Sequence, residues 1–314
     1  MKRLISLVLI AALGWSGYWF WQAHIARQAV TGWFEDRRAD GWQAEYDDLR
    51  VRGFPNRIDV TLDAPRLSDP DRDVAWQAPF LQVLRLSYRQ GHEIVVFPDA
   101  QQLTLPSGDW DITSDGLRAS VVHEGDGILM RANAEAEVLN LNGPERSLAL
   151  AGMTAAIAQL GGQPYQYRIG LGADALAGQG TGEGLLIEAI VDFDGPWNIG
   201  EGARPRPEEI ELRLAQYETE GMALRLTGTL DIDPDGIPEG ELTLQAENWR
   251  ELLETAREAG QIDPTLADAL EQGLSLVAGL RGNPETLDLP LDFRDDRVFI
   301  GPVPVGRTPR LQLP

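Results

Sequence analysis

The chain has 314 residues, a formal net charge of −22 and no cysteine. The absence of cysteine excludes disulfides, thiol catalysis and cysteine metal sites, and the acidity argues against nucleic acid, whose phosphates need clustered cations. Hydrophobic residues make up 43% of the chain, which is ordinary for a folded globular protein.

Residues 1–26 predict a transmembrane anchor. The stretch from Leu4 to Ala26 carries no formal charge. As a helix it would reach roughly 34 Å, enough to cross a hydrocarbon core of about 30 Å. Lys2 and Arg3 precede it and stay cytoplasmic by the positive-inside rule, so the body is expected in the periplasm on a single-pass inner-membrane anchor. The proposed anchor residues are Lys2, Arg3 and Leu4 at the inner end and the interfacial aromatics Trp15, Trp19 and Trp21 at the outer end.

A cleaved signal peptide is the alternative, and it would leave a soluble periplasmic protein. Its apolar core would run from Leu4 to Ala11, with Ala12 and Gly14 as the small residues before the cut. Cuts after Ala23 or Ala26 fit less well because a large residue, Trp21 or His24, would stand at the third position back. A buried core helix is a further alternative.

Residues 27–41 predict a juxtamembrane helix. Apolar residues keep a helical period from Ile25 through Val30 and Trp33 to Phe34. Gly41 is a typical C-terminal stop. We expect this helix to pack on its own domain; a role on the membrane surface is the alternative.

The rest of the chain alternates between apolar and polar residues, which predicts β-strands in two β-rich halves, 42–150 and 151–314. Met222–Ile232 and Leu242–Ala246 form one predicted hairpin, and Leu287–Phe293 with Val298–Ile300 form another. Further strands are predicted at 49–62, 80–88, 94–97, 101–105, 110–113, 117–122, 128–141, 165–171, 185–193 and 209–217. One apolar face per strand indicates a mainly β (α+β) fold of curved antiparallel sheets.

Two segments depart from this pattern. Leu148–Gly162 is rich in Ala and Gly and predicts a short helix at the seam between the halves. Residues 248–280 predict a helical hairpin: Asn248 and Glu251 cap the first helix, which ends at Gly260, and Asp263-Pro264 opens the second. We expect the hairpin to plug the end of a sheet core, with partner docking as the alternative.

The motifs predict no catalytic, cofactor or metal site. Asp231-Ile-Asp-Pro-Asp-Gly236 resembles the start of a calcium loop, but Leu242 stands where a bidentate Glu is needed, so a hairpin turn is predicted. Gly170–Ala175 imitates a dinucleotide fingerprint without a following helix and predicts a glycine-rich loop. Asp109 and Asp111 leave an envelope hydrolase as a minor alternative.

Two Gly-Pro segments predict structural kinks. Gly53 permits an unusual backbone angle and Pro55 cannot donate to a strand ladder, so a kink between strands is expected. Gly301 and Pro302 are expected to end strand pairing near the C-terminus.

Several phrases together resemble a known family, and they span nearly the whole chain. They are Gly17-Tyr-Trp-Phe20, Gly41-Trp-Gln-Ala-Glu-Tyr46, Arg52-Gly-Phe-Pro-Asn-Arg57, Trp76-Gln-Ala-Pro-Phe80, Leu86-Ser-Tyr88, Asn248-Trp249 and Phe299-Ile-Gly-Pro-Val-Pro-Val-Gly306. The chain resembles the uncharacterised proteobacterial family catalogued as domain of unknown function 2125. This resemblance implies an envelope protein and no catalytic residues. More distantly, an anchor followed by a β-rich body is similar to the AsmA-type envelope proteins, which are linked to lipid movement.

Together these observations predict a non-catalytic, membrane-anchored periplasmic protein without cofactors. Its curved sheet would bind lipid or another apolar ligand, because each strand has one apolar face. The alternative is an assembly factor or scaffold for other envelope proteins.

Overall fold

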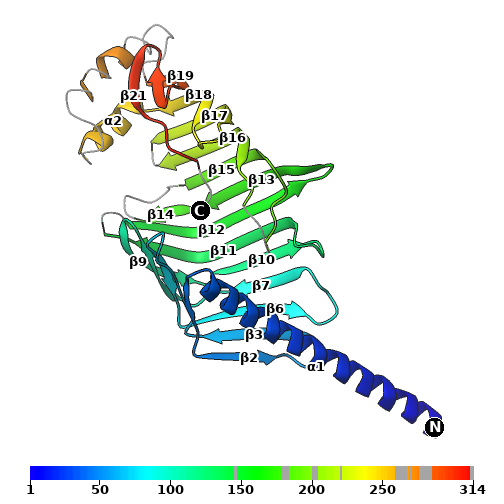
Figure 1. Ribbon diagram of the computed structural model, residues 1–314. Coiled ribbons are helices and arrows are strands. Elements are labelled where there is room, and N and C mark those ends of the chain that lie inside the picture. The colour runs from blue at the N-terminus through cyan, green and yellow to red at the C-terminus, as the bar shows by residue number, and fades with distance from the viewer. Residues whose placement is uncertain are drawn as a thin grey trace. The chain divides into compact units, whose positions relative to one another are not determined.

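A computed structural model describes residues 1–144, 147–177, 184–199, 204–219, 221–258, 267–268, 271–275 and 285–311. The described chain is mainly β, with a long apolar helix at the N-terminus, as predicted (Figure 1). It divides into two compact units, unit 1 at Met1–Met153 and unit 2 at Thr154–Pro314.

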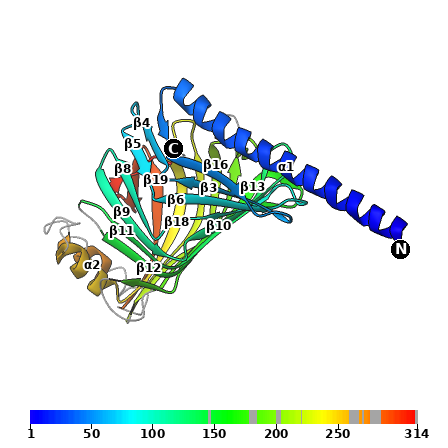
Figure 2. The same ribbon diagram turned by 90° about the horizontal axis from the view of Figure 1, so that it is seen from below.

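Helix α1 (Lys2–Ala39) joins the predicted anchor and the predicted juxtamembrane helix without a break. It contains no proline, and Arg37 and Arg38 in its last turn complement the helix dipole. It ends before Gly41, whose φ is +91°. The N-terminal part of α1 extends beyond the strands (Figures 1 and 2).

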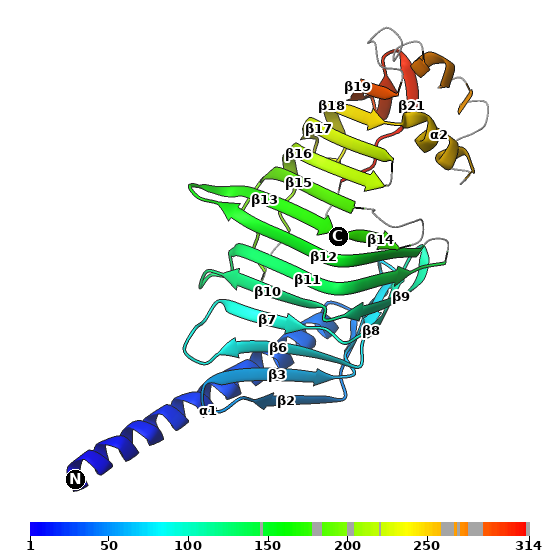
Figure 3. The ribbon, with the colours of Figure 1, turned by 180° about the vertical axis from the view of Figure 1, so that it is seen from behind.

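Unit 1 is an antiparallel meander of long strands, and all of them except the last, Leu129–Asn142, are broken into two labelled pieces. Asp48 in β2 faces Asp63 in β3, and after the break Glu45 in β1 faces Arg66 in β4, so the register stays in step. Both pieces of each broken strand likewise pair with the next strand, with a one-residue shift of register at the break between β7 and β8. Figure 3 shows β2, β3, β6 and β7 side by side. The strands are β1 (Gln43–Glu45), β2 (Asp48–Arg52), β3 (Arg57–Asp63), β4 (Arg66–Asp69), β5 (Val74–Gln77), β6 (Phe80–Leu86), β7 (His92–Val96), β8 (Ala100–Leu105), β9 (Gly108–Asp115), β10 (Arg118–His123) and β11 (Leu129–Asn142).

Prolines mark three of these breaks. Pro65 separates β3 from β4, Pro79 separates β5 from β6, and Pro98 separates β7 from β8. A proline cannot donate to a strand ladder, so each one interrupts the pairing where it stands. The breaks therefore lie at matching positions of neighbouring strands and interrupt the pairing there.

The core of unit 1 lies between α1 and the first strands. It contains Trp19, Ala26 and Phe34 of α1 with Ala44, Leu49, Ile58, Val60 and Leu62. The prediction that the helix packs on its own domain is confirmed. However, Trp19 had been assigned to the membrane anchor, and it is only 5% exposed in the protein core.

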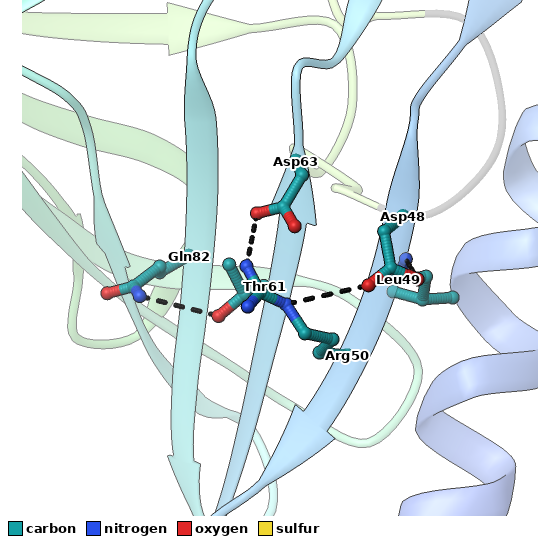
Figure 4. Close-up of polar contacts among 6 residues, drawn as sticks. All are labelled: Asp48, Leu49, Arg50, Thr61, Asp63 and Gln82. Atoms are coloured by element: carbon teal, nitrogen blue, oxygen red, sulfur yellow. Dashed lines mark hydrogen bonds and ion pairs between the residues drawn. The ribbon is translucent and has the colours of Figure 1, made fainter.

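The opposite face of β2 and β3 is polar, and Gln82 of β6 extends its network (Figure 4). Arg50 forms an ion pair with Asp63, and its Nε lies 3.7 Å from a carboxylate oxygen of Asp48. The side-chain amide of Gln82 donates to the Thr61 hydroxyl at 3.3 Å. The alternation of β2 and β3 thus separates an apolar face under α1 from a hydrogen-bonded polar face, whereas β6 carries apolar residues on both faces.

Unit 2 continues as an antiparallel meander in the order β12, β13, β15, β16, β17, β18, β19, β20, β21. Both predicted hairpins, β17 with β18 and β19 with β20, are confirmed. The elements are β12 (Ser147–Leu160, which crosses the unit boundary), β13 (Gln163–Ala173), β14 (Ala175–Ala177), β15 (Gly184–Phe193), β16 (Pro207–Thr219), β17 (Met222–Ile232), β18 (Pro238–Glu247), α2 (Trp249–Glu258), β19 (Thr286–Arg294), β20 (Arg297–Ile300) and β21 (Val303–Arg307).

Three local predictions were wrong. The segment 148–162 forms most of β12 and a turn instead of a helix, because pairing with β13 overrides the helix propensity of its alanines. Gly170 and Gly172 lie inside β13, so no loop forms there; residues 178–183 lie outside the described residues. Strand pairing does not end at Gly301-Pro302, because β21 pairs with β20 after this turn.

The first half of the predicted helical hairpin is confirmed as α2. Asn248 precedes it and donates its side-chain amide to the Gly221 carbonyl, while Glu251 N–H donates to the Asn248 carbonyl at 3.0 Å. Residues 267–268 and 271–275 are also helical, whereas Gly260 and Asp263-Pro264 lie outside the described residues. Trp249, Leu253 and Leu274 of this region pack against Ala246, Leu287 and Leu289 of the sheet.

Candidate functional site

Unit 2 presents a continuous apolar face across its strands. Each pairing register places an apolar residue of one strand beside an apolar residue of the next. We define the apolar row as the side chains Ala155, Leu171, Ile187, Ala215, Leu226, Leu244 and Leu289. Parallel rows on the same face include Ile169, Ala189, Leu212 and Leu242 on one side and Leu185, Tyr217, Leu224 and Ala246 on the other.

The apolar row is only partly covered. Leu171, Ile187, Leu226 and Leu244 are half-buried, although they lie in the middle of the sheet. Leu289, at the β19 end, is 5% exposed because α2 and the neighbouring helical residues pack over it. Leu226 also packs against the buried Leu230, Ile232 and Leu242, so this face is covered over β17 and β18 as well. Side chains such as Leu171 and Ile187 stay partly exposed.

The dimensions and chemistry of the apolar row suit an elongated apolar molecule. Five steps between neighbouring strands, from β12 to β18, give a length of about 24 Å. The opposite side of the same strands carries charged residues such as Glu188, Glu211 and Glu241. The sheet is therefore apolar on one face and solvated on the other.

The second notable feature is the junction between α1 and two turns of unit 1. Trp15 Nε1 donates to the Pro55 carbonyl at 3.0 Å, and Trp19 Nε1 donates to the Arg57 carbonyl at 2.6 Å. The Tyr18 hydroxyl donates to the Ser87 carbonyl at 3.0 Å. These bonds fix the helix to the turn before β3 and the turn after β6.

Gln22 adds a polar contact inside this junction. Its side chain is 4% exposed, its amide nitrogen donates to the Tyr18 hydroxyl at 3.1 Å, and its carbonyl accepts from Arg85 at 3.2 Å. The sequence interpretation missed Gln22, Arg85 and Ser87. A polar glutamine inside an otherwise apolar anchor was the signal that could have pointed to a protein contact.

The predicted anchor residues fall into two groups. Lys2, Arg3 and Leu4 lie at the exposed free end of α1. At the other end Trp15 is 38% and Trp21 57% exposed, whereas Trp19 is in the core. In the described residues α1 is the helix long and apolar enough to cross a membrane. A signal-peptide cut after Ala23 or Ala26 would remove Trp19 and Gln22 from unit 1; a cut near Gly14 would not.

The predicted kink residues are turn residues. Gly53 has a φ of +104°, and a Cβ there would lie 2.7 Å from the Arg57 carbonyl oxygen, so only glycine fits this approach. The Pro55 carbonyl accepts hydrogen bonds from Trp15 and, at 3.3 Å, from the Ser87 hydroxyl. Gly301, with a φ of +58°, and Pro302 form the turn between β20 and β21.

Unit 1 also contains a polar pocket of about 630 Å³. Its lining includes Glu45, Arg66, Gln77, Gln102 and Asp111. An ion pair with Asp47 raises the pKa of Arg66. This lining suits a polar ligand and not an acyl chain.

Both aspartates of the hydrolase alternative line that pocket. Asp109 accepts a hydrogen bond from the Thr104 hydroxyl at 2.8 Å. Asp109 and Asp111 are both exposed, so neither has the buried environment typical of a general acid.

The calcium-like segment is a hairpin turn, as predicted. One carboxylate oxygen of Asp233 accepts the backbone N–H groups of Asp235 at 2.9 Å and Ile237 at 2.8 Å. Among the described residues, no group of three His, Asp or Glu side chains is placed to hold a metal ion.

These features define a class of protein: a mainly antiparallel β body fused to an N-terminal helix of membrane-crossing length. The chain belongs to the family described as "Uncharacterized protein conserved in bacteria (DUF2125)", which matches residues 19–309. The resemblance identified in the sequence is therefore confirmed. The match begins at Trp19, the first buried residue of α1. No curated protein and no protein of solved structure matches the chain.

Proposed function

We propose that this protein is a non-catalytic, inner-membrane-anchored periplasmic protein that binds a lipid acyl chain along the apolar row of unit 2. The observation that carries the proposal is the incompletely buried line of Leu171, Ile187, Leu226 and Leu244 in the middle of a sheet. Such a surface is stabilised when an apolar molecule removes it from water.

The apolar row itself supplies the energy, because an acyl chain taken from a bilayer is already out of water. Each ~100 Å² of the row that the chain covers contributes about 2.5 kcal/mol before ordering costs. The row, about 24 Å long, exceeds the depth of one leaflet, which is about half of a 30 Å hydrocarbon core. A single acyl chain can therefore lie on it at full length.

The anchorage is supported by the length and composition of α1 and by Lys2 and Arg3 at its free end. The positive-inside rule then assigns the body to the periplasmic side. The non-catalytic part of the proposal is supported by the hairpin role of the Asp231–Gly236 segment and by the turn-like roles of Gly53 and Gly301.

The test uses the full chain in nanodiscs that contain a phospholipid with a photoreactive group on one acyl chain. We expect crosslinked peptides from β13 to β18. Ile187→Gln should reduce this labelling, because Ile187 lies on the apolar row. Leu186→Gln is the matched control, because Leu186 directly precedes Ile187 in β15, is 38% exposed and points to the opposite face.

Labelling that is absent from unit 2, or that responds equally to the two substitutions, would overturn the proposal. A protein-binding scaffold is the competing function. It would be favoured if the same preparations held no lipid on unit 2 and instead retained a stoichiometric envelope protein that Ile187→Gln releases and Leu186→Gln does not.

A further inference from the structure

We propose that the end of unit 1 beside α1 lies in the interfacial layer of the bilayer through an aromatic collar. The collar consists of Trp15, Phe20, Trp21, Phe54 and Tyr88, whose side chains are 38%, 65%, 57%, 53% and 62% exposed. The inference rests on the proposed membrane anchorage of α1. It adds a surface of the β body to the membrane contact and assigns it a partner, the phospholipid interface.

The collar joins α1 to two turns that are distant in the sequence. Phe54 belongs to the turn between β2 and β3, and Tyr88 belongs to the turn between β6 and β7. The Phe54 ring stacks on Phe20 with centroids 6.1 Å apart and meets Trp19 edge-on at 5.5 Å. The turns and the helix therefore present one aromatic surface.

The length of the free helix places this surface at the membrane. Trp15 is already hydrogen-bonded to the turn at Pro55, so the free helix runs only from Lys2 to Gly14. That segment is about 20 Å long, whereas the hydrocarbon core is about 30 Å thick. A helix that crosses the core needs about 20 residues, which carries it from Leu4 past Trp21.

Crossing the bilayer therefore brings part of unit 1 into contact with lipid. The bonds from Trp15, Tyr18 and Trp19 hold the two turns at the level of the helix segment that must reach the far boundary. Tilting the helix only lengthens the required segment. Phe54 and Tyr88 then enter the layer that aromatic side chains prefer.

The local charge favours phospholipid over an arbitrary apolar partner. The whole chain carries a net charge of −22, yet residues 4–34, 52–57 and 86–91 contain no Asp or Glu. The two turns carry Arg52, Arg57 and Arg89. Arg57 forms an ion pair with Asp59, and among the described residues Arg52 and Arg89 form none. Guanidinium groups next to aromatic rings match the phosphate and acyl boundary of a bilayer.

The experiment exploits the absence of cysteine in the chain. Single cysteines at Phe54 (F54C) and Tyr88 (Y88C) receive an environment-sensitive fluorophore in the full chain, in nanodiscs of phosphatidylglycerol and phosphatidylethanolamine. Doxyl-labelled lipids then report depth by quenching. Ser107→Cys is the control, because Ser107 is exposed in the β8–β9 turn, at the other end of the long strands. Leu9→Cys reports insertion of the anchor itself.

We expect strong quenching at F54C and Y88C by a doxyl group near the headgroup, strong quenching at L9C by a deep doxyl group, and none at S107C. If L9C is quenched but F54C and Y88C are no more quenched than S107C, the collar is refuted and the proposed anchor is retained. A label at L9C that is unquenched, or lost with a cleaved peptide, would overturn both. If F54C fails to fold, N56C in the same turn replaces it, because Asn56 is exposed.

Discussion

Replacing Trp19 by alanine should destabilise unit 1 far more than replacing Trp21 by alanine. Trp19 is 5% exposed and Trp21 is 57% exposed, although they are two residues apart in the same helix. Removing a buried Trp side chain costs about 3–5 kcal/mol. The hydrogen bond from Trp19 Nε1 to the Arg57 carbonyl adds about 0.5–1.5 kcal/mol.

These numbers convert into a measurable shift. For a unit of this size, Met1–Met153, each kcal/mol lowers the Tm by about 2–4 °C, so Trp19→Ala should lower it by roughly 15 °C. Trp21→Ala removes an exposed side chain and should change stability by only about 0.5 kcal/mol. Trp19→Phe should fall between the two, because it keeps a packed ring and loses the hydrogen bond.

The assay is thermal unfolding of the full chain in a mild detergent, followed by far-UV circular dichroism. Limited proteolysis with peptide identification assigns the transition to unit 1. Equal Tm values for Trp19→Ala and Trp21→Ala would refute the reasoning, because they would show that α1 is not part of the core. A lower Tm for Trp21→Ala would refute it more strongly.

Two further substitutions test unit 2. The pKa of Asp194 is lowered, chiefly by the backbone N–H of Arg206 at 2.7 Å and also by its guanidinium. This carboxylate therefore stabilises the fold above its unfolded pKa of about 3.9, and the contribution is lost as the pH falls through the lower folded value. Asp194→Asn should therefore reduce the loss of Tm at acid pH. An unchanged dependence of Tm on pH would contradict this prediction. Gly228→Ala should destabilise unit 2 by roughly 1–3 kcal/mol, because its φ is +146° and a Cβ would lie 2.3 Å from the Glu241 carbonyl oxygen. Gly170→Ala is the control, since its nearest contact would be an ordinary 3.8 Å, and equal urea-denaturation midpoints for the two would contradict the prediction.

The sequence predicts the strands of this protein well because each has one apolar face. The alternation from Met222 to Ile232 is visible in the sequence, and β17 has those bounds. The Ala-rich segment 148–162 was misread because its side chains are small and carry little pattern. Only pairing with β13, which lies in the following residues, makes it a strand.

The long bent strands could not be predicted from local signals. Pro65, Pro79 and Pro98 read as ordinary loop residues, because a proline between two strands predicts a connection. Only the register shows that β3 and β4 form one strand that passes Pro65 without reversing, since both pair in step with β6 and β5. Such continuity depends on neighbouring strands and not on the local sequence.

The aromatic cluster at the outer end of the predicted anchor is visible in the sequence, but the sequence does not show which of its side chains are buried and which are exposed. Hydropathy treats Trp15, Trp19 and Trp21 alike as interfacial residues. In the structure, Trp19 faces the strands and Trp21 faces outward, because helical geometry turns residues two apart by about 200°. The buried Gln22 marks the same face as Trp19, so the boundary between anchor and domain runs along the helix and not across it.

With the proposed anchorage, the membrane tether and the fold of unit 1 become a single structure. The chain, with a net charge of −22, gains little from an anionic lipid surface, so the proposed attachment depends on α1 and the collar. Because Trp19, Ala26 and Phe34 of that helix complete the core, the helix cannot leave the strands without exposing apolar surface. In the proposed arrangement the bilayer and the strands therefore contact opposite faces of the same helical segment. Any change that loosens α1 from the strands should weaken both the position of unit 1 at the membrane and its resistance to unfolding.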